Sequence, residues 1–123
     1  MILPCIASGN RVVAVPSLKA ALIVADFYQL LDTSDVPGGV INLVTGVPSE
    51  LATVLAAHDD VAAIWAVGPV DECEQIKKES AGNLKSVWTS DGKSPDWYDS
   101  QAEGSSWLER ATQVKNIWVP YGE

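Results

Sequence analysis

The chain has 123 residues, the length of a single domain, of which 47% are hydrophobic and 20% are charged. Sixteen acidic against eight basic residues give a formal net charge of −8, which argues against a nucleic-acid or membrane partner, and the apolar content excludes a disordered acidic tail. The longest apolar run, 20–25, is too short to cross a bilayer, no leader sequence is recognisable, and two cysteines are too few for a disulfide scaffold. We therefore expect a cytoplasmic protein with reduced thiols.

The N-terminal third is expected to form a strand followed by a long helix. Residues 11–15 are mostly β-branched and lie between turn-forming residues, which predicts a buried strand. Ser17 resembles a helix N-cap, and apolar residues recur behind it at helical spacing as far as residue 31. Because several faces of this helix are apolar, we expect it to be covered on more than one side. A proline and two glycines within 35–39 end it.

The middle of the chain repeats this alternation. Its elements are expected in the order strand 40–44, helix 48–57, strand 62–67, helix 71–80 and strand 84–88. Short apolar strands separated by helices of this length are typical of βαβ units with right-handed crossovers. The predicted fold class is therefore α/β: a Rossmann-like open parallel sheet of about four strands with flanking helices, extended by a C-terminal β-strand.

The pattern changes at residue 90. Residues 90–106 are rich in Asp, Gly and Ser, which predicts an exposed connection that is either functional or a junction. Residues 107–111 are expected to form a helical turn, and the alternation within 114–119 predicts a last strand. We therefore expect a Rossmann-like core over 1–95, followed by a linker and a C-terminal strand over 96–123.

Few residues have the chemistry of a catalytic site. His58 lies beside Asp59 and Asp60, which would suit a general base, but neighbours on a turn rarely face each other and a solvated turn is favoured. Cys73 lies in an acidic helix whose carboxylates oppose a nucleophilic thiolate, and Cys5 is expected to be a small core residue. The acidic clusters around His58 and Cys73 would suit a cation, although solvated surface is the commoner role. We expect no metal site.

Three glycines, Gly9, Gly46 and Gly68, each lie next to a predicted strand. In an open α/β sheet the loops at the carboxyl ends of the strands form the ligand crevice, and helix N-termini there favour anions. Gly46 and Gly68 are therefore the best-placed backbone for a nucleotide phosphate. The chain has no glycine-rich phosphate motif, so ordinary βα turns remain an equal alternative.

Five segments of the chain resemble motifs of aldehyde dehydrogenases. Residues 3–17 are similar to the family's P-A-L-A-x-G-N-T-V-V-x-K-P-S-E, and residues 36–46 to L-P-x-G-V-x-N-x-V-x-G. Residues 57–64 are similar to H-P-x-V-x-x-I, and residues 83–95 to N-L-K-x-V-x-L-E-L-G-G-K-S-P. Residues 111–119 resemble the C-terminal strand Y-T-x-V-K-x-V-x-V. Together the segments cover most of the chain in the family's order.

The resemblance implies NAD or NADP as the cofactor of the parent family, and it also shows why this chain is expected to bind none. By family position the cofactor-binding residues are Val15, Pro16, Ser17, Gly46 and Gly68. The family's ribose-binding Lys and Glu are here Ala14 and Leu18, and the Ser near the pyrophosphate is Pro69, which has neither a hydroxyl nor an N–H group.

The catalytic positions of the family are missing as well. The general-base Glu falls near Thr89 or Ser90, and neither can replace a carboxylate as a base. Neither Cys5 nor Cys73 stands in the nucleophile's context, and the oxyanion-hole Asn is absent, so we assign no catalytic residue. A short bridge stands where the family has its catalytic domain. The chain thus resembles the truncated, degenerate C-terminal second copy of a double-domain aldehyde dehydrogenase, and its abrupt start suggests a fragment.

Three hypotheses follow. The first is a non-catalytic module with a structural or oligomerisation role, whose partner is a catalytic aldehyde dehydrogenase domain or another copy of the chain. The second is the NAD-binding portion of an NAD(P)-dependent aldehyde dehydrogenase, an oxidoreductase acting on aldehydes. The third, an unrelated α/β binding domain, is disfavoured by the ordered matches. The first is preferred because the cofactor contacts at Ala14 and Pro69 are lost.

The predicted C-terminal strand is the expected interface. An unpaired edge with apolar side chains is an association hazard, so we expect the strand to add to a sheet edge in a partner by main-chain hydrogen bonds. A fifth strand folded back onto the chain's own sheet is the alternative. Trp118 is expected to be the buried anchor. The interface residues are Val114, Asn116, Ile117, Trp118 and Val119.

Overall fold

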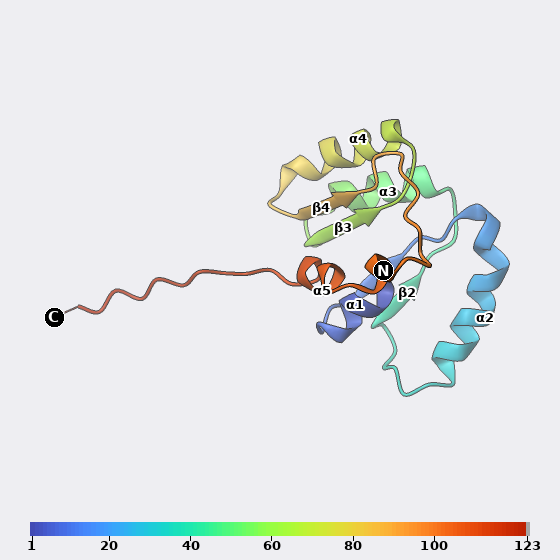
Figure 1. Ribbon diagram of the computed structural model, residues 1–123, viewed down its shortest axis with the longest axis horizontal. Helices are drawn as coiled ribbons and strands as arrows, with labels where there is room; N and C mark the ends of the chain where they lie inside the picture. Colours follow the sequence, from blue (N-terminus) through green and yellow to red (C-terminus); the bar gives the residue numbers. More distant parts are fainter. Residues whose placement is uncertain (123) are drawn as a thin grey trace.

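The computed structural model describes residues 1–122, and its N-terminal part is a βαβ unit preceded by a short helix (Figure 1). Strands β1 and β2 run parallel, with Val12 opposite Ile41 and Ala14 opposite Leu43. The elements of this part are α1 (Ile2–Ala7), β1 (Val12–Ala14), the 3-10 turn η1 (Leu18–Ala20), α2 (Ala21–Asp32) and β2 (Ile41–Leu43).

The second part is another βαβ unit with an extra helix before it. Strands β3 and β4 are parallel and place Trp65 directly opposite Trp88. Helices α3 and α4 pack side by side over one face of this strand pair (Figure 1), and their buried residues Ala56, Cys73 and Ile76 form most of the core. The elements are α3 (Pro48–Ala57), β3 (Ala63–Ala66), α4 (Val70–Glu79), the 3-10 turn η2 (Ser80–Gly82) and β4 (Ser86–Thr89).

The predicted α/β class with four parallel strands is confirmed. The strands, however, form two separate pairs, β1–β2 and β3–β4, instead of one continuous sheet. Each pair is closed by its own crossover helix, and strands of three or four residues offer few ladder hydrogen bonds to a further neighbour. Ser17 makes no side-chain cap, because the short turn η1 separates it from the start of α2 at Ala21.

A cluster of aromatic rings covers the other face of β3–β4. Trp107, from the short helix α5 (Ser106–Arg110), is 8% exposed and lies with its ring centroid 5.4 Å from that of Trp65 and 4.9 Å from that of Trp88. The Trp97 ring lies 6.0 Å away, and the Arg110 guanidinium is 5.7 Å from the Trp88 ring centroid. Edge-to-face rings and a cation over an aromatic face both add to the energy of burial.

The connection 90–106 is exposed over most of its described length, as predicted, but it contacts the body at a few points. Ser90 is buried, Trp97 joins the ring cluster, and a 3-10 turn, η3 (Ser100–Glu103), precedes α5. The expected helical turn at 107–111 is present as α5. Apolar rings in a polar segment were the signal for this packing, because burying each ring removes a large area from water.

One side chain fixes the point where the chain leaves the body. The Asn10 amide donates hydrogen bonds to the carbonyl of Ala111, at 2.8 Å, and to that of Cys5, at 3.2 Å. The first bond spans almost the whole sequence and joins the loop after α1 to the end of α5. The segment that follows, residues 112–122, is hereafter called the tail, and it extends away from every helix and strand (Figure 1).

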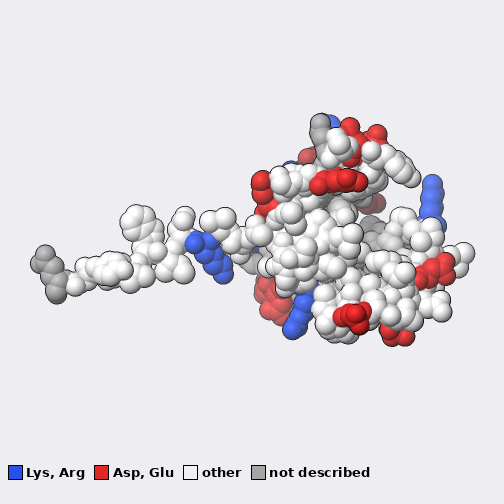
Figure 2. All heavy atoms as spheres, turned by 60° about the horizontal axis from the view of Figure 1, so that its bottom comes forward, with Lys and Arg blue, Asp and Glu red and all other residues white. Residues whose placement is uncertain are grey.

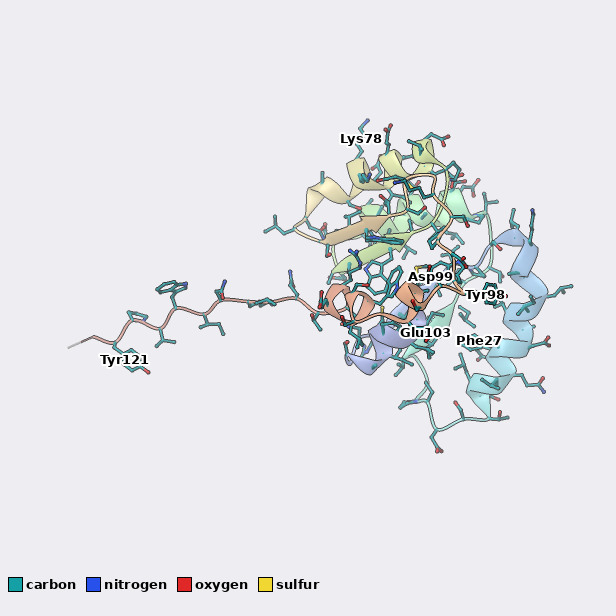
Figure 3. All side chains as sticks on the ribbon, viewed as in Figure 1. Phe27, Lys78, Tyr98, Asp99, Glu103 and Tyr121 are labelled. Atoms are coloured by element: carbon teal, nitrogen blue, oxygen red, sulfur yellow. The ribbon has the colours of Figure 1, made fainter. Side chains whose placement is uncertain are left out.

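The tail does not form the expected strand within the described part of the chain. Residues 114–119 are extended but make no ladder, so the alternative of a fifth strand folded back onto its own sheet is wrong. Trp118 is 92% exposed, and Figure 3 shows Tyr121 far out on the tail. A strand needs a neighbour to satisfy its N–H and C=O groups, and no edge of this chain lies beside the tail.

Helix α2 is also more open than expected. The prediction that it is covered on more than one side is wrong, because none of its residues is buried and Leu22 and Ile23 are largely exposed. The whole chain exposes 9381 Å², whereas a compact monomer of 13.1 kDa exposes about 6,400 Å². Strands β1 and β2 give α2 only one narrow layer to pack on. No helix in residues 1–122 is both long and apolar enough to cross a membrane.

The end of α3 is capped by a lysine that lies far away in the sequence. The half-buried Lys85 ammonium donates to the carbonyls of Ala56, at 2.5 Å, and His58, at 2.7 Å. We expect Lys85→Met to lower the free energy of unfolding by about 1–3 kcal/mol, since hydrogen bonds from a charged donor to a helix C-terminus are lost. Urea denaturation measures the change.

The matched control is Lys78→Met, because Lys78 is exposed and points away from α4 (Figure 3). This control should leave stability nearly unchanged. Equal losses in both variants would show that the Lys85 cap contributes nothing specific.

Candidate functional site

The crevice expected at the carboxyl ends of the strands would include the turn after β3, and the main-chain groups of that turn are already bonded. The Gly68 N–H donates to the Ser90 hydroxyl at 3.2 Å, and the Gly68 carbonyl accepts from the Gly92 N–H at 3.0 Å. Gly92 has φ +77°, and a Cβ there would lie 2.8 Å from a methyl group of Val70, so only glycine fits this turn. The Gly68 loop is thus tied to the end of β4.

Helix N-termini attract anions, but both helices that begin at this crevice carry acids in their first turns. Helix α4 has Asp71 and Glu72 there, and a Glu72 carboxylate oxygen would lie 3.3 Å from a Cβ at Gly68. Helix α3 has Glu50, and the Leu51 side chain packs so closely over Gly46 that a Cβ would lie 2.9 Å from it. An anionic pyrophosphate at the Gly68 turn would meet the Glu72 carboxylate.

The three remaining candidate positions lie elsewhere. Val15 and Pro16 help to line an apolar hollow of about 400 Å³ beside α1 and α2, whereas Gly46 and Gly68 do not line it. Ser17 is exposed and caps no helix. Of the five candidate residues, only the neighbours Val15 and Pro16 line this hollow, so the five do not form one binding site.

A carboxylate that the sequence reasoning missed lies next to the expected general-base position. Asp91 has φ +48°, and its carboxylate accepts from the Lys77 ammonium at 2.5 Å and from the Thr89 hydroxyl at 2.7 Å. The hydrogen bond from Lys77, followed by that from Thr89, lowers the pKa of Asp91, and the same ion pair raises the pKa of Lys77. A carboxylate with a lowered pKa is a poorer base.

The thiols and the histidine show no catalytic arrangement. Cys73 is buried, with its Sγ 3.5 Å from the Gly68 carbonyl. Burial raises the pKa of Cys5, which opposes formation of a nucleophilic thiolate. His58 is exposed at the end of α3, and its Nδ1 accepts from the Asp60 N–H at 3.2 Å, as the solvated-turn interpretation expects. Among residues 1–122, no three His, Cys, Asp or Glu side chains gather as metal ligands.

Comparison with known proteins identifies the family of the chain. The model of the aldehyde dehydrogenase family matches residues 1–113. The chain is 38% identical over 93 residues to (Z)-2-((N-methylformamido)methylene)-5-hydroxybutyrolactone dehydrogenase of Acinetobacter baylyi, which covers 75% of this chain and 19% of that protein. It is 34% identical over 90 residues to the NADP/NAD-dependent aldehyde dehydrogenase PuuC of Escherichia coli, covering 72% of this chain and 18% of that one.

A solved structure agrees with the sequence matches. The aldehyde dehydrogenase of Bartonella henselae superposes with a TM-score of 0.68 and 30% sequence identity, over 73% of this chain and 19% of that chain. This chain therefore spans about a fifth of the length of the relatives that it matches. The order of the motifs and the α/β fold both agree with the match, and the chain belongs to the aldehyde dehydrogenase family.

Proposed function

We propose that this chain is a non-catalytic, structural module of aldehyde dehydrogenase type, which associates through its tail with a catalytic aldehyde dehydrogenase domain or with another copy of itself. The proposal rests on the hydrogen bonds and charges at the turn after β3. The Gly68 N–H group, which would have to face a pyrophosphate, is bonded to Ser90, and acids occupy the first turns of both adjoining helices. Both features oppose the binding of a dinucleotide.

The tail supports the second half of the proposal. Its apolar side chains are almost fully exposed, including Ile117 at 83% and Trp118 at 92%. Large exposed apolar side chains on an extended segment are typical of strands that complete a sheet in a partner. The predicted interface residues, from Val114 to Val119, are thus free to pair along both edges.

The isolated chain should oxidise no aldehyde with NAD or NADP. The thiols are buried or have a raised pKa, and the Asp91 carboxylate next to the expected base position is held by Lys77. The assay follows NADH absorbance with short aliphatic and aromatic aldehydes at increasing protein concentration. The control is Cys5→Ser, which should give the same background rate. Aldehyde-dependent NADH production that scales with the chain and is lost in this variant would overturn the proposal.

Binding of NAD should be weak or absent as well. The two charged contacts missing at Ala14 and Leu18 are each worth about 1–3 kcal/mol, which together lowers affinity by a factor of about a thousand. Titration calorimetry should show no saturation in the micromolar range. Removing the first-turn acids of α4 in Asp71→Asn/Glu72→Gln should raise whatever affinity remains. Micromolar affinity in the unmodified chain would favour the competing function, an NAD-binding portion of an aldehyde dehydrogenase.

A further inference from the structure

An apolar hollow lies between α1 and α2, on the side of α1 that faces α2. It measures about 400 Å³, and its walls include Ile2 from α1, Ile23 and Phe27 from α2, and the ring of Trp97. Trp97 is 45% exposed, so one more aromatic ring has room to pack against it. A hollow of this size with apolar walls suits a single aromatic side chain.

We propose that the tail folds back and that Trp118 docks in the hollow of its own chain, a closed state that withholds the tail from a partner. The inference rests on the proposed role of the tail in association and adds an internal contact that competes with it. The structure holds the open state, in which the tail is extended and Trp118 is 92% exposed (Figure 1). Docking therefore removes Trp118 from water without breaking a buried contact of its ring.

The start of the tail lies within reach of the hollow of the same chain. The Asn10 amide nitrogen donates to the carbonyl oxygens of Cys5, at 3.2 Å, and Ala111, at 2.8 Å, so these two oxygens lie within about 6 Å of each other. Cys5 follows Ile2 by three residues in α1, a rise of about 4.5 Å, and Ile2 lines the hollow. Residues 112–118 extend to about 23 Å. The tail is therefore long enough to pass α1 and enter the hollow.

The short connection favours the chain's own hollow over that of a second copy. A tether of seven residues holds the indole ring near the hollow at an effective concentration in the millimolar range. Charge acts in the same direction. The net charge is −8, and Figure 2 shows acidic side chains spread over the body, so two bodies repel each other. Within 112–122 the one charged residue is Lys115, which is attracted to its own acidic body.

We expect the closed state to be no more populated than the open one. The hollow takes one side chain, and closure orders seven residues of the tail, which costs conformational entropy. Two states of equal population change the stability of the fold little, because only the population of the tail is redistributed. A partner that pairs with the tail then has to displace a single ring. Closure therefore weakens pairing with a partner without preventing it.

A disulfide between the hollow and the tail of one chain tests closure. In a Cys5→Ser background, Ile23→Cys is combined with Asn116→Cys, which shares a face of the extended tail with Trp118. The matched control uses Leu22→Cys in place of Ile23→Cys, since Leu22 is exposed and does not line the hollow. Under oxidation the Ile23 pair should close at least about fivefold faster than the Leu22 pair, at a rate independent of protein concentration. Far-ultraviolet circular dichroism checks that each variant is folded.

Two variants of the tail decide whether Trp118 drives the closure. Trp118→Ala should lower the rate of the Ile23 pair to that of the Leu22 pair. Tyr121→Ala should leave the rate within about twofold, because Tyr121 lies on the opposite face of the tail. Equal rates for the two pairs, or a rate that Trp118→Ala leaves unchanged, would overturn the inference. A product that is mainly a disulfide-linked dimer would also overturn it, since another molecule would then fill the hollow.

Sedimentation of the cross-linked chain separates this inference from the proposed function. The oxidised Ile23 pair should associate with itself about tenfold more weakly than the same chain after reduction, because its Trp118 is held in the hollow. An oxidised chain that associates as strongly as the reduced one would overturn the inference and keep the role of the tail. If the reduced chain does not associate with itself, the proposed self-association fails, while the cross-linking rates still decide closure.

Discussion

Replacing Trp107 with alanine should cost the chain about 3–5 kcal/mol of unfolding free energy, the range measured for buried aromatic residues. Trp107 is the only large side chain from the C-terminal quarter that is buried in the described chain, and it contacts the rings of Trp65, Trp88 and Trp97. Domains of this size have total stabilities of about 5–15 kcal/mol. The loss therefore removes a large share of that stability.

The control for this prediction is Leu108→Ala, because Leu108 is the next residue of α5 and is 47% exposed. It should lower the unfolding free energy far less than Trp107→Ala does. Trp107→Phe should fall between the two, since it keeps an aromatic ring for Trp88. Chemical denaturation followed by circular dichroism gives the three values. A Trp107→Ala chain as stable as Leu108→Ala would show that the ring cluster contributes little to folding.

Truncation after Thr112 should abolish self-association and leave the fold intact. Thr112 donates to the Glu109 carbonyl, but residues 113–122 make no hydrogen bond to the described part of the body, so their removal should change the unfolding free energy by less than about 0.5 kcal/mol. Light scattering should report the monomer mass, and the melting temperature should stay where it was. A truncated chain that keeps the association of the intact one but melts much lower would place the tail in the core, contrary to the structure.

The alternation of strands and helices could be predicted from the sequence between residues 11 and 89, whereas α1 (Ile2–Ala7) was not predicted. Periodic apolar residues and turn residues are local signals, so β1 to β4 and α2 to α4 lie close to their expected positions. The division of the strands into two pairs could not be predicted, because it depends on contacts between distant segments. The ring cluster around Trp107 was not predicted for the same reason, since the two tryptophans of this polar segment, Trp97 and Trp107, show no periodicity.

The candidate site shows the same limit. The positions of Gly46 and Gly68 after strands were predictable, but the bond from the Gly68 N–H to Ser90 joins residues 22 positions apart. Asp91 was missed because its pairing with Lys77 depends on the left-handed backbone conformation of Asp91. The residues before it do not predict that conformation. The tail was expected to be a strand, and its alternation is genuine. An alternating segment becomes a strand only when it pairs with the edge of another strand, and local sequence does not show where such an edge lies.

The bond between Asn10 and Ala111 has a consequence for the reach of the tail. It anchors every tail at the same point, and eleven extended residues reach at most about 36 Å from there. Any sheet edge that the tail joins must therefore lie within that distance of the end of α5. Loosening the anchor, as in Asn10→Ala, should widen the range of partner positions that the tail can reach.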